Sequence, residues 1–149
     1  MNLRRVRASD WAAGLCGAAL VGLLWAPWYR SGHTFDAWQS MAVNDVIFLI
    51  AGLLAVWVVV ATATQSTGAV PIGADAFAAL VGVIACVLAV IRLVWPPDLG
   101  PGPTGRAAGV WLGTASALGI AASALAAMRS ERRGEGVEVP VRSIPAPQA

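Results

Sequence analysis

The sequence predicts an all-α membrane protein, a bundle of four transmembrane helices with a short helix at the outer membrane surface. Hydrophobic residues make up 58% of the 149-residue chain and charged residues 12%, whereas a soluble domain carries about 25% charged residues. Four long apolar runs cover most of the chain, and none has a charge near its middle. Because a helix needs about 20 apolar residues to cross the bilayer, we expect spans over residues 10–27, 44–62, 75–95 and 106–128.

The first span is expected to leave the membrane at Pro27, which weakens a helix. Trp28 and Tyr29 follow, and aromatic rings of this kind suit the headgroup region. The next segment places Phe35, Trp38, Met41 and Ala42 at helical spacing, and Thr34 can cap a helix there. We therefore predict a short helix in the interface, with its polar side toward water. The candidate outer contact surface consists of Trp28, Tyr29, Arg30, His33, Asp36 and Trp38.

Asn44 can cap the second span, and Asp45 in its first turn suits the positive end of the helix dipole. Residues 62–74 are small and polar with Gly and Pro, a composition that predicts a loop. Asp75 lies at the start of the third span, where its carboxylate likewise suits the positive end of the helix dipole. Residues 96–105 contain four prolines, so we expect no regular structure in this connection.

Arg92 is the charge that lies clearly inside an apolar run, about one turn from the outer end of the third span. Asp45 begins the second span on the same side. Consecutive antiparallel helices are usually neighbours, so the carboxylate and the guanidinium should reach a similar depth. We predict an ion pair between Asp45 and Arg92. The alternative is that Arg92 extends to the lipid headgroups.

Small residues recur four positions apart in the last two spans, a spacing that lets helix backbones approach closely. We expect these stripes to pack inside the bundle, with self-association as the alternative. The residues concerned are Gly109, Gly113, Ala117 and Ala121 in the fourth span and Ala78, Gly82 and Cys86 in the third.

Arginine sets the expected orientation, since all ten cationic residues are Arg. Seven lie near the two termini, against Arg30, Arg92 and Arg106 on the opposite side. The positive-inside rule then predicts a multi-pass protein of the cell membrane with both termini in the cytoplasm. Residues 1–128 form the expected membrane domain, and residues 129–149, rich in charge and then in Pro and Ala, form a disordered cytoplasmic tail.

The outer polar residues do not have the spacing of a metal site or of a catalytic group. The sequence has no P-loop, dinucleotide fingerprint, nucleophile elbow or HExxH motif. We therefore expect no enzyme, no cofactor and no metal. We also expect no nucleic-acid partner, because attraction to anionic lipid already explains arginine beside a span. The expected partners are the bilayer and either another membrane protein or a second copy of the chain.

The segments Pro27-Trp28-Tyr29 and Asp45-Val46, and Arg92 before Pro96-Pro97, resemble an uncharacterised group of small four-span membrane proteins from high-GC bacteria. The resemblance implies the four-span fold and carries no mechanism. Two functions from different classes stay open. The first is a non-enzymatic accessory or scaffold component of a membrane complex, and the alternative is a small oligomeric transporter or channel.

Overall fold

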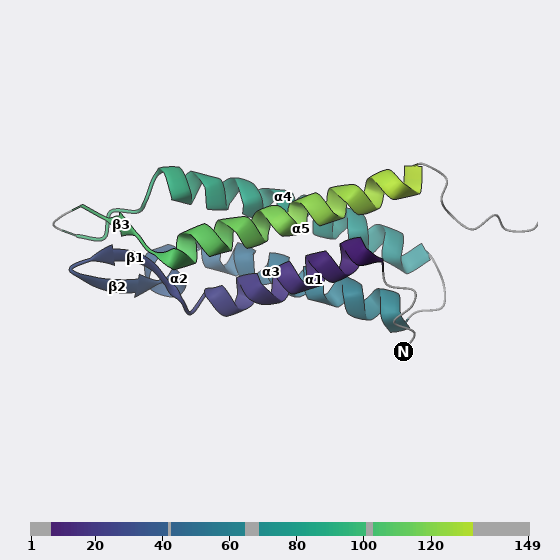
Figure 1. Cartoon of the computed structure of the whole chain (residues 1–149), viewed down its shortest axis with the longest axis horizontal. Helices are drawn as coiled ribbons and strands as arrows, with labels where there is room; N and C mark the ends of the chain where they lie inside the picture. The colour runs from purple at the N-terminus through teal and green to yellow at the C-terminus, as the bar shows by residue number, and fades with distance from the viewer. Residues whose placement is uncertain (1–6, 42, 65–68, 101–102, 133–149) are drawn as a thin grey trace, which may run out of the picture.

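Four long helices run side by side in the computed structural model, which describes residues 7–41, 43–64, 69–100 and 103–132 (Figure 1). For residues 69–75 and 130–132 it describes the backbone alone. The long helices are α1 (Ala8–Leu23), α3 (Val43–Thr64), α4 (Ala69–Val94) and α5 (Ala108–Arg132).

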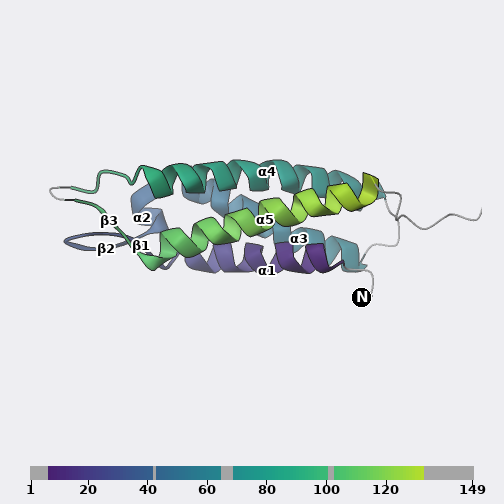
Figure 2. The same cartoon turned by 45° about the horizontal axis from the view of Figure 1, so that its top comes forward.

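The four helices form a ring in which each packs mainly against two others. Helix α1 contacts α3 and α5, and α4 contacts the same two helices on the other side. Successive helices run in opposite directions, so α1 begins and α5 ends at the same end of the bundle (Figure 2). A small sheet lies at the opposite end. We call this end the capped end and the other end the open end.

Three helices in the described residues are long and apolar enough to cross a membrane, namely Val43–Thr64, Ala76–Val94 and Ala108–Arg129. Helix α1 is apolar but has only 16 residues. The expected helical fold is therefore confirmed, and three of its helices are compatible with crossing a membrane, whereas a fourth span stays a prediction. The first span ends earlier than predicted, at Leu23 rather than residue 27, because the chain turns after Leu24 and enters a strand at Pro27.

Two other boundaries differ from the prediction. Helix α4 begins at Ala69, inside the segment expected to be a loop, and Pro71 fits there because the first helical turn does not need its missing N–H. Helix α5 continues to Arg132, four residues past the predicted end of the span at 128. The remainder of the predicted tail, from residue 133, lies outside the described residues.

The three-stranded sheet at the capped end was not predicted. Its strands are β1 (Pro27–Ser31), β2 (His33–Asp36) and β3 (Gly105–Arg106), in the order β2-β1-β3 and antiparallel throughout. Gly32 turns the hairpin between β1 and β2 with a φ of +74°, a conformation that glycine adopts at low cost. Gly105, expected in an irregular connection, is part of β3.

A short helix lies in the predicted segment as α2 (Ala37–Met41), and it is shorter than expected. Its place in the membrane interface stays a prediction. Thr34 and Phe35 belong to β2 instead. The cap is Asp36, whose Oδ1 accepts a hydrogen bond from the backbone N–H of Gln39 at 2.8 Å. Asp36, which the sequence places in the outer contact surface, therefore also caps a helix.

Close packing of small residues holds the bundle together, as the stripes predicted. A Cβ added at Gly17 of α1 would lie 2.6 Å from the carbonyl oxygen of Gly52 in α3. A Cβ at Gly82 of α4 would lie 2.9 Å from Ile120 of α5. Ala117 and Ala121 are buried in the same interface region. The stripes therefore serve internal packing.

Candidate functional site

Trp28 lies inside the capped end, with none of its surface exposed. Its indole Nε1 donates a hydrogen bond to the carbonyl of Leu23 at 2.6 Å. The ring stacks on Phe48 of α3 with centroids 5.7 Å apart. The indole also packs against Gly109 and Gly113 of α5, where an added Cβ would collide with it. Trp28 thus connects the end of α1 to α3 and α5, and its predicted place in an outer contact surface is wrong.

Tyr29 is also fully buried, so it too leaves the predicted contact surface. Its hydroxyl donates a hydrogen bond to the backbone carbonyl of Arg92 at 2.8 Å. Burial raises the pKa of Tyr29 to about 12; the Arg92 and Arg106 charges act in the lowering direction, and Asp45 adds to the rise. The hydroxyl therefore stays a hydrogen-bond donor well above neutral pH.

The C-terminus of α4 is satisfied by residues from outside that helix. The last four carbonyls of a helix have no partner within it. Here Ile91 accepts from the N–H of Trp95 at 2.7 Å and Arg92 accepts from Tyr29. The Arg106 guanidinium donates to Leu93 at 2.6 Å and to Val94 at 3.0 Å. A cation at this position also suits the negative end of the helix dipole.

Tyr29 and Arg106 reach α4 together because they are partners in the sheet. The two residues face each other in the β1–β3 pairing. The backbone N–H of Ala107 extends that connection by donating to the carbonyl of Trp28 at 2.8 Å. One short stretch of sheet therefore fixes the segment after α1, the segment before α5 and the end of α4 against each other.

Asp45 lies in the first turn of α3 and has no exposed surface. Neither of its carboxylate oxygens has a hydrogen-bond partner among the described residues. A hydrogen-bonded pair with Arg92 is therefore absent from this structure, and Arg92 contributes its backbone carbonyl to Tyr29 instead. Attraction between the two charges at longer range stays a prediction. A buried carboxylate without a partner is costly, so this is the most unusual polar group at the capped end.

The outward side of the capped end carries the other predicted contact residues. Arg30 and His33 are exposed, and 37% of the Trp38 surface is exposed. The imidazole of His33 lies 4.0 Å from the ring of Phe35, measured between centroids. Trp38 lies 5.9 Å from Trp25 by the same measure. We define the outer face as Trp25, Arg30, His33 and Trp38.

The described residues contain no group of three or more His, Cys, Asp or Glu side chains placed to hold a metal ion. Cys16 and Cys86 are free thiols, half-buried on different helices. Among the described residues of the capped end, Trp28, Tyr29 and Arg106 all donate hydrogen bonds to backbone carbonyls.

Two polar residues of structural importance escaped the sequence analysis. The sequence placed Arg106 only among the three arginines on the side opposite the termini, whereas it caps α4. Asp10 in α1 is buried with 7% of its surface exposed, although it opens an apolar run. Ser9 and Asp10 are residue types that favour the first turn of a helix, so the sequence could have placed Asp10 there, but it carries no signal for the burial of its side chain.

Searches of protein families, of curated proteins and of solved structures find no match to this chain.

Proposed function

We propose that this protein is a non-enzymatic accessory or scaffold component of a membrane complex, a multi-pass protein of the cell membrane with both termini in the cytoplasm. The observation that carries the proposal is the hydrogen-bonded construction of the capped end. Its sheet, its tyrosine and its arginine hold the loops in one conformation, and they leave the outer face turned outward. A preformed surface loses little entropy when it binds a partner.

The chemistry of the outer face fits contact with another protein at the membrane surface. Tryptophan and arginine are enriched at the centres of protein interfaces, and Trp25, Trp38 and Arg30 lie on this face. The rings also suit the headgroup region of the bilayer, so the partner is best placed in or beside the membrane.

Packing within the bundle supports the scaffold over a transport pathway. The middle of the bundle is filled mainly by one cluster of apolar side chains. They include Leu20, Phe48, Ala51, Ala55, Ala85, Ala89, Ala117 and Ile120. Buried Thr114 donates its hydroxyl to the carbonyl of Val110 in its own helix, which leaves it poorly suited to line a water-filled route.

The alternative function, a small oligomeric transporter or channel, is favoured by one observation. Asp45 is fully buried and unpartnered among the described residues, and ionisable residues inside membranes usually serve function. In that case, Asp45 would be the first residue to test for a role in moving an ion.

Purification in mild detergent from native membranes tests the scaffold. We expect the protein to elute with one larger membrane complex at fixed stoichiometry. A variant combining Arg30→Ala, His33→Ala and Trp38→Ala should lose that complex while its own thermal unfolding is unchanged. Trp57→Ala is the matched control, since Trp57 is exposed to 47% on α3, away from the outer face.

Proton flux in proteoliposomes, followed with a pH-sensitive dye, tests the alternative. The scaffold predicts no flux above empty vesicles. Proton flux that disappears in Asp45→Asn would support the transporter. If the outer-face variant also still elutes with the larger complex, the transporter function replaces the scaffold function.

A further inference from the structure

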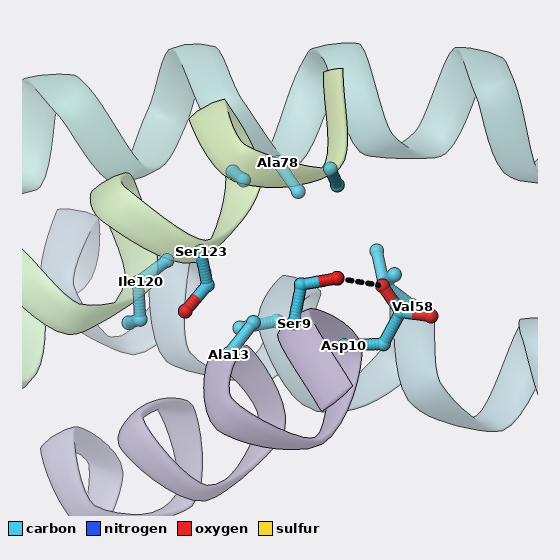
Figure 3. A pocket seen from close by; sticks show the side chains of 10 residues that line it. Ser9, Asp10, Ala13, Val58, Ala78, Ile120 and Ser123 are labelled. Carbon is cyan, nitrogen blue, oxygen red and sulfur yellow. Dashed lines mark hydrogen bonds between the residues drawn. The ribbon is translucent and has the colours of Figure 1, made fainter. Parts of the chain in front are cut away.

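A small cavity lies toward the open end of the bundle, where all four long helices meet (Figure 3). Its volume is ≈ 20 Å³. Alanine, valine and isoleucine side chains form most of its wall, and α1, α3, α4 and α5 all contribute. Three polar side chains also line it: Ser9 and Asp10 from α1 and Ser123 from α5. A polar cluster in so apolar a wall calls for a physical explanation.

Asp10 retains hydrogen-bonding capacity in this cavity. Its Oδ2 accepts a hydrogen bond from the backbone N–H of Arg7 at 3.0 Å. Its Oδ1 accepts one from the Ser9 hydroxyl at 3.4 Å, the contact drawn in Figure 3. That distance is long for a hydroxyl and a carboxylate, which normally approach to about 2.5–2.7 Å. Since a carboxylate offers about four acceptor sites, the Asp10 carboxylate can accept more.

Ser123 is the polar group on the facing helix. It is half-buried on α5, which packs directly against α1. Most serine hydroxyls inside a membrane helix bond the carbonyl one turn earlier, as Thr114 does here. No such bond from Ser123 is found within the part of the chain that the structure describes, so its hydroxyl can turn toward the cavity.

We infer that this cavity is a binding site for a single water molecule that bridges Asp10 of α1 to Ser123 of α5. A cavity needs a volume of about 10–15 Å³, counted as the space open to the centre of a water-sized sphere, to hold one water. That water also needs two to four polar partners. The volume meets the first condition, and the Asp10 carboxylate and the Ser123 hydroxyl offer partners for the second. Water donates to the carboxylate and accepts from the serine hydroxyl. The inference is independent of the proposed function.

The ligand set favours water over a divalent metal ion. Calcium takes about six to eight oxygen ligands, and magnesium requires near-octahedral coordination. One carboxylate and two hydroxyls supply fewer atoms than either ion requires. The bridge has a structural role. Helix α1 is the shortest of the four long helices and has the fewest residues to pack against its neighbours, and the water adds a polar connection between α1 and α5.

Methyl NMR in lipid nanodiscs tests the inference on the full chain with ¹³C-methyl-labelled alanine. We expect nuclear Overhauser cross-peaks between water and the methyl groups of Ala13 and Ala124, which line the cavity. Ala85 and Ala89 are the internal controls, since both are fully buried elsewhere in the core and should show none. Absence of a water cross-peak at both Ala13 and Ala124 in the unaltered protein overturns the proposal, whatever the variants do.

Two variants then locate the bridge. Ser123→Ala should weaken the cross-peaks and lower the Tm, because the water loses its partner on α5. Ser116→Ala, on the same helix but outside the cavity, should leave the cross-peaks unchanged. Equal cross-peaks in both variants would contradict the bridging role. The peaks should also be the same in sodium and in choline buffer, since methyl shifts that follow the sodium concentration would identify a cation in place of water.

Discussion

Trp28 occupies a space that exists only because two residues of α5 lack side chains. Its indole lies against Gly109 and Gly113 on one side and stacks on Phe48 on another. Buried indole rings remove a large apolar area from water, and the Nε1 donor is satisfied by Leu23. The fit at this one position therefore decides how closely the capped end joins the bundle.

Gly113→Ala should destabilise the protein by about 1–3 kcal/mol, the usual cost of overpacking a close-fitting core. The added Cβ would overlap the Trp28 ring, which has no free space to enter. Gly22→Ala is the matched control, because nothing lies within 4 Å of the added atom and alanine favours a helix over glycine. Thermal unfolding in detergent measures both, and equal stability of the two variants would refute the packing role.

Tyr29 is the single tyrosine of the chain, so its titration can be followed alone by absorbance of the phenolate. We expect a pKa of about 12 in the folded protein and about 10 once it is unfolded. Because the folded pKa is the higher one, folding is favoured below pH 10, and that contribution is lost as the pH rises toward 12. A folded-state titration near pH 10 would show that the hydroxyl is not buried.

Tyr29→Phe should lower stability by about 1–3 kcal/mol at neutral pH, since the Arg92 carbonyl loses its donor in a buried place. The variant should also lose the alkaline part of the pH dependence. Chemical or thermal unfolding at pH 7 and at pH 11 checks both effects.

At the scale of elements, the long helices were predictable and the sheet was not. Apolar runs indicate helices through composition alone, and α3, α4 and α5 follow from them. The strands have five, four and two residues. The pairing of Tyr29 with Arg106 joins segments far apart in the sequence, so no local pattern announces it.

The candidate site was predicted in part for the same reason. Arg30, His33 and Trp38 are exposed as expected, because polar residues and interfacial rings near a span end usually are. Trp28 and Tyr29 fit the same statistical pattern, yet they are buried. Their environment depends on glycines of α5 and on the end of α4, which lie more than 60 residues later in the chain.

The connection between Arg106 and α4 yields a prediction about local opening. Arg106→Ala should remove the donors to Leu93 and Val94, and the last turn of α4 should exchange its amide hydrogens faster. Because Arg106 is exposed, water can replace it, and we expect a global loss of about 0.3–1 kcal/mol. Hydrogen exchange followed by mass spectrometry compares Arg106→Ala with Arg30→Ala. In Arg30→Ala, the amides at the end of α4 should exchange as in the unaltered protein. Equal protection of α4 in the two variants would show that the cap is unimportant.

For the whole molecule, the alternation of helix directions brings the start of α1 and the end of α5 to one end of the bundle. The arginine distribution adds the expected side of the membrane. The ring arrangement also explains how four helices can share one core although α1 is short, since each helix has two antiparallel neighbours.

Labelling of single cysteines tests the orientation in a background in which Cys16 and Cys86 are replaced by alanine. We expect His33→Cys to react with a membrane-impermeant maleimide in intact cells. Arg129→Cys should react only after the membrane is opened. Both positions are exposed at opposite ends of the bundle, so the reverse pattern would invert the topology.

The pairing of β1 with β3 also determines the order in which the chain can mature during synthesis. The first hairpin of helices emerges from the ribosome with Trp28 and Tyr29 already made, but Arg92, Arg106 and the α5 glycines follow much later. Until then, both aromatic side chains lack part of the packing that buries them, and contacts between distant segments form slowly. We expect a chain that stops before α5 to leave the Trp28 ring uncovered on the side where Gly109 and Gly113 pack, and to be cleaved faster by proteases than the full chain. Closure of the capped end would then mark a chain whose insertion is complete.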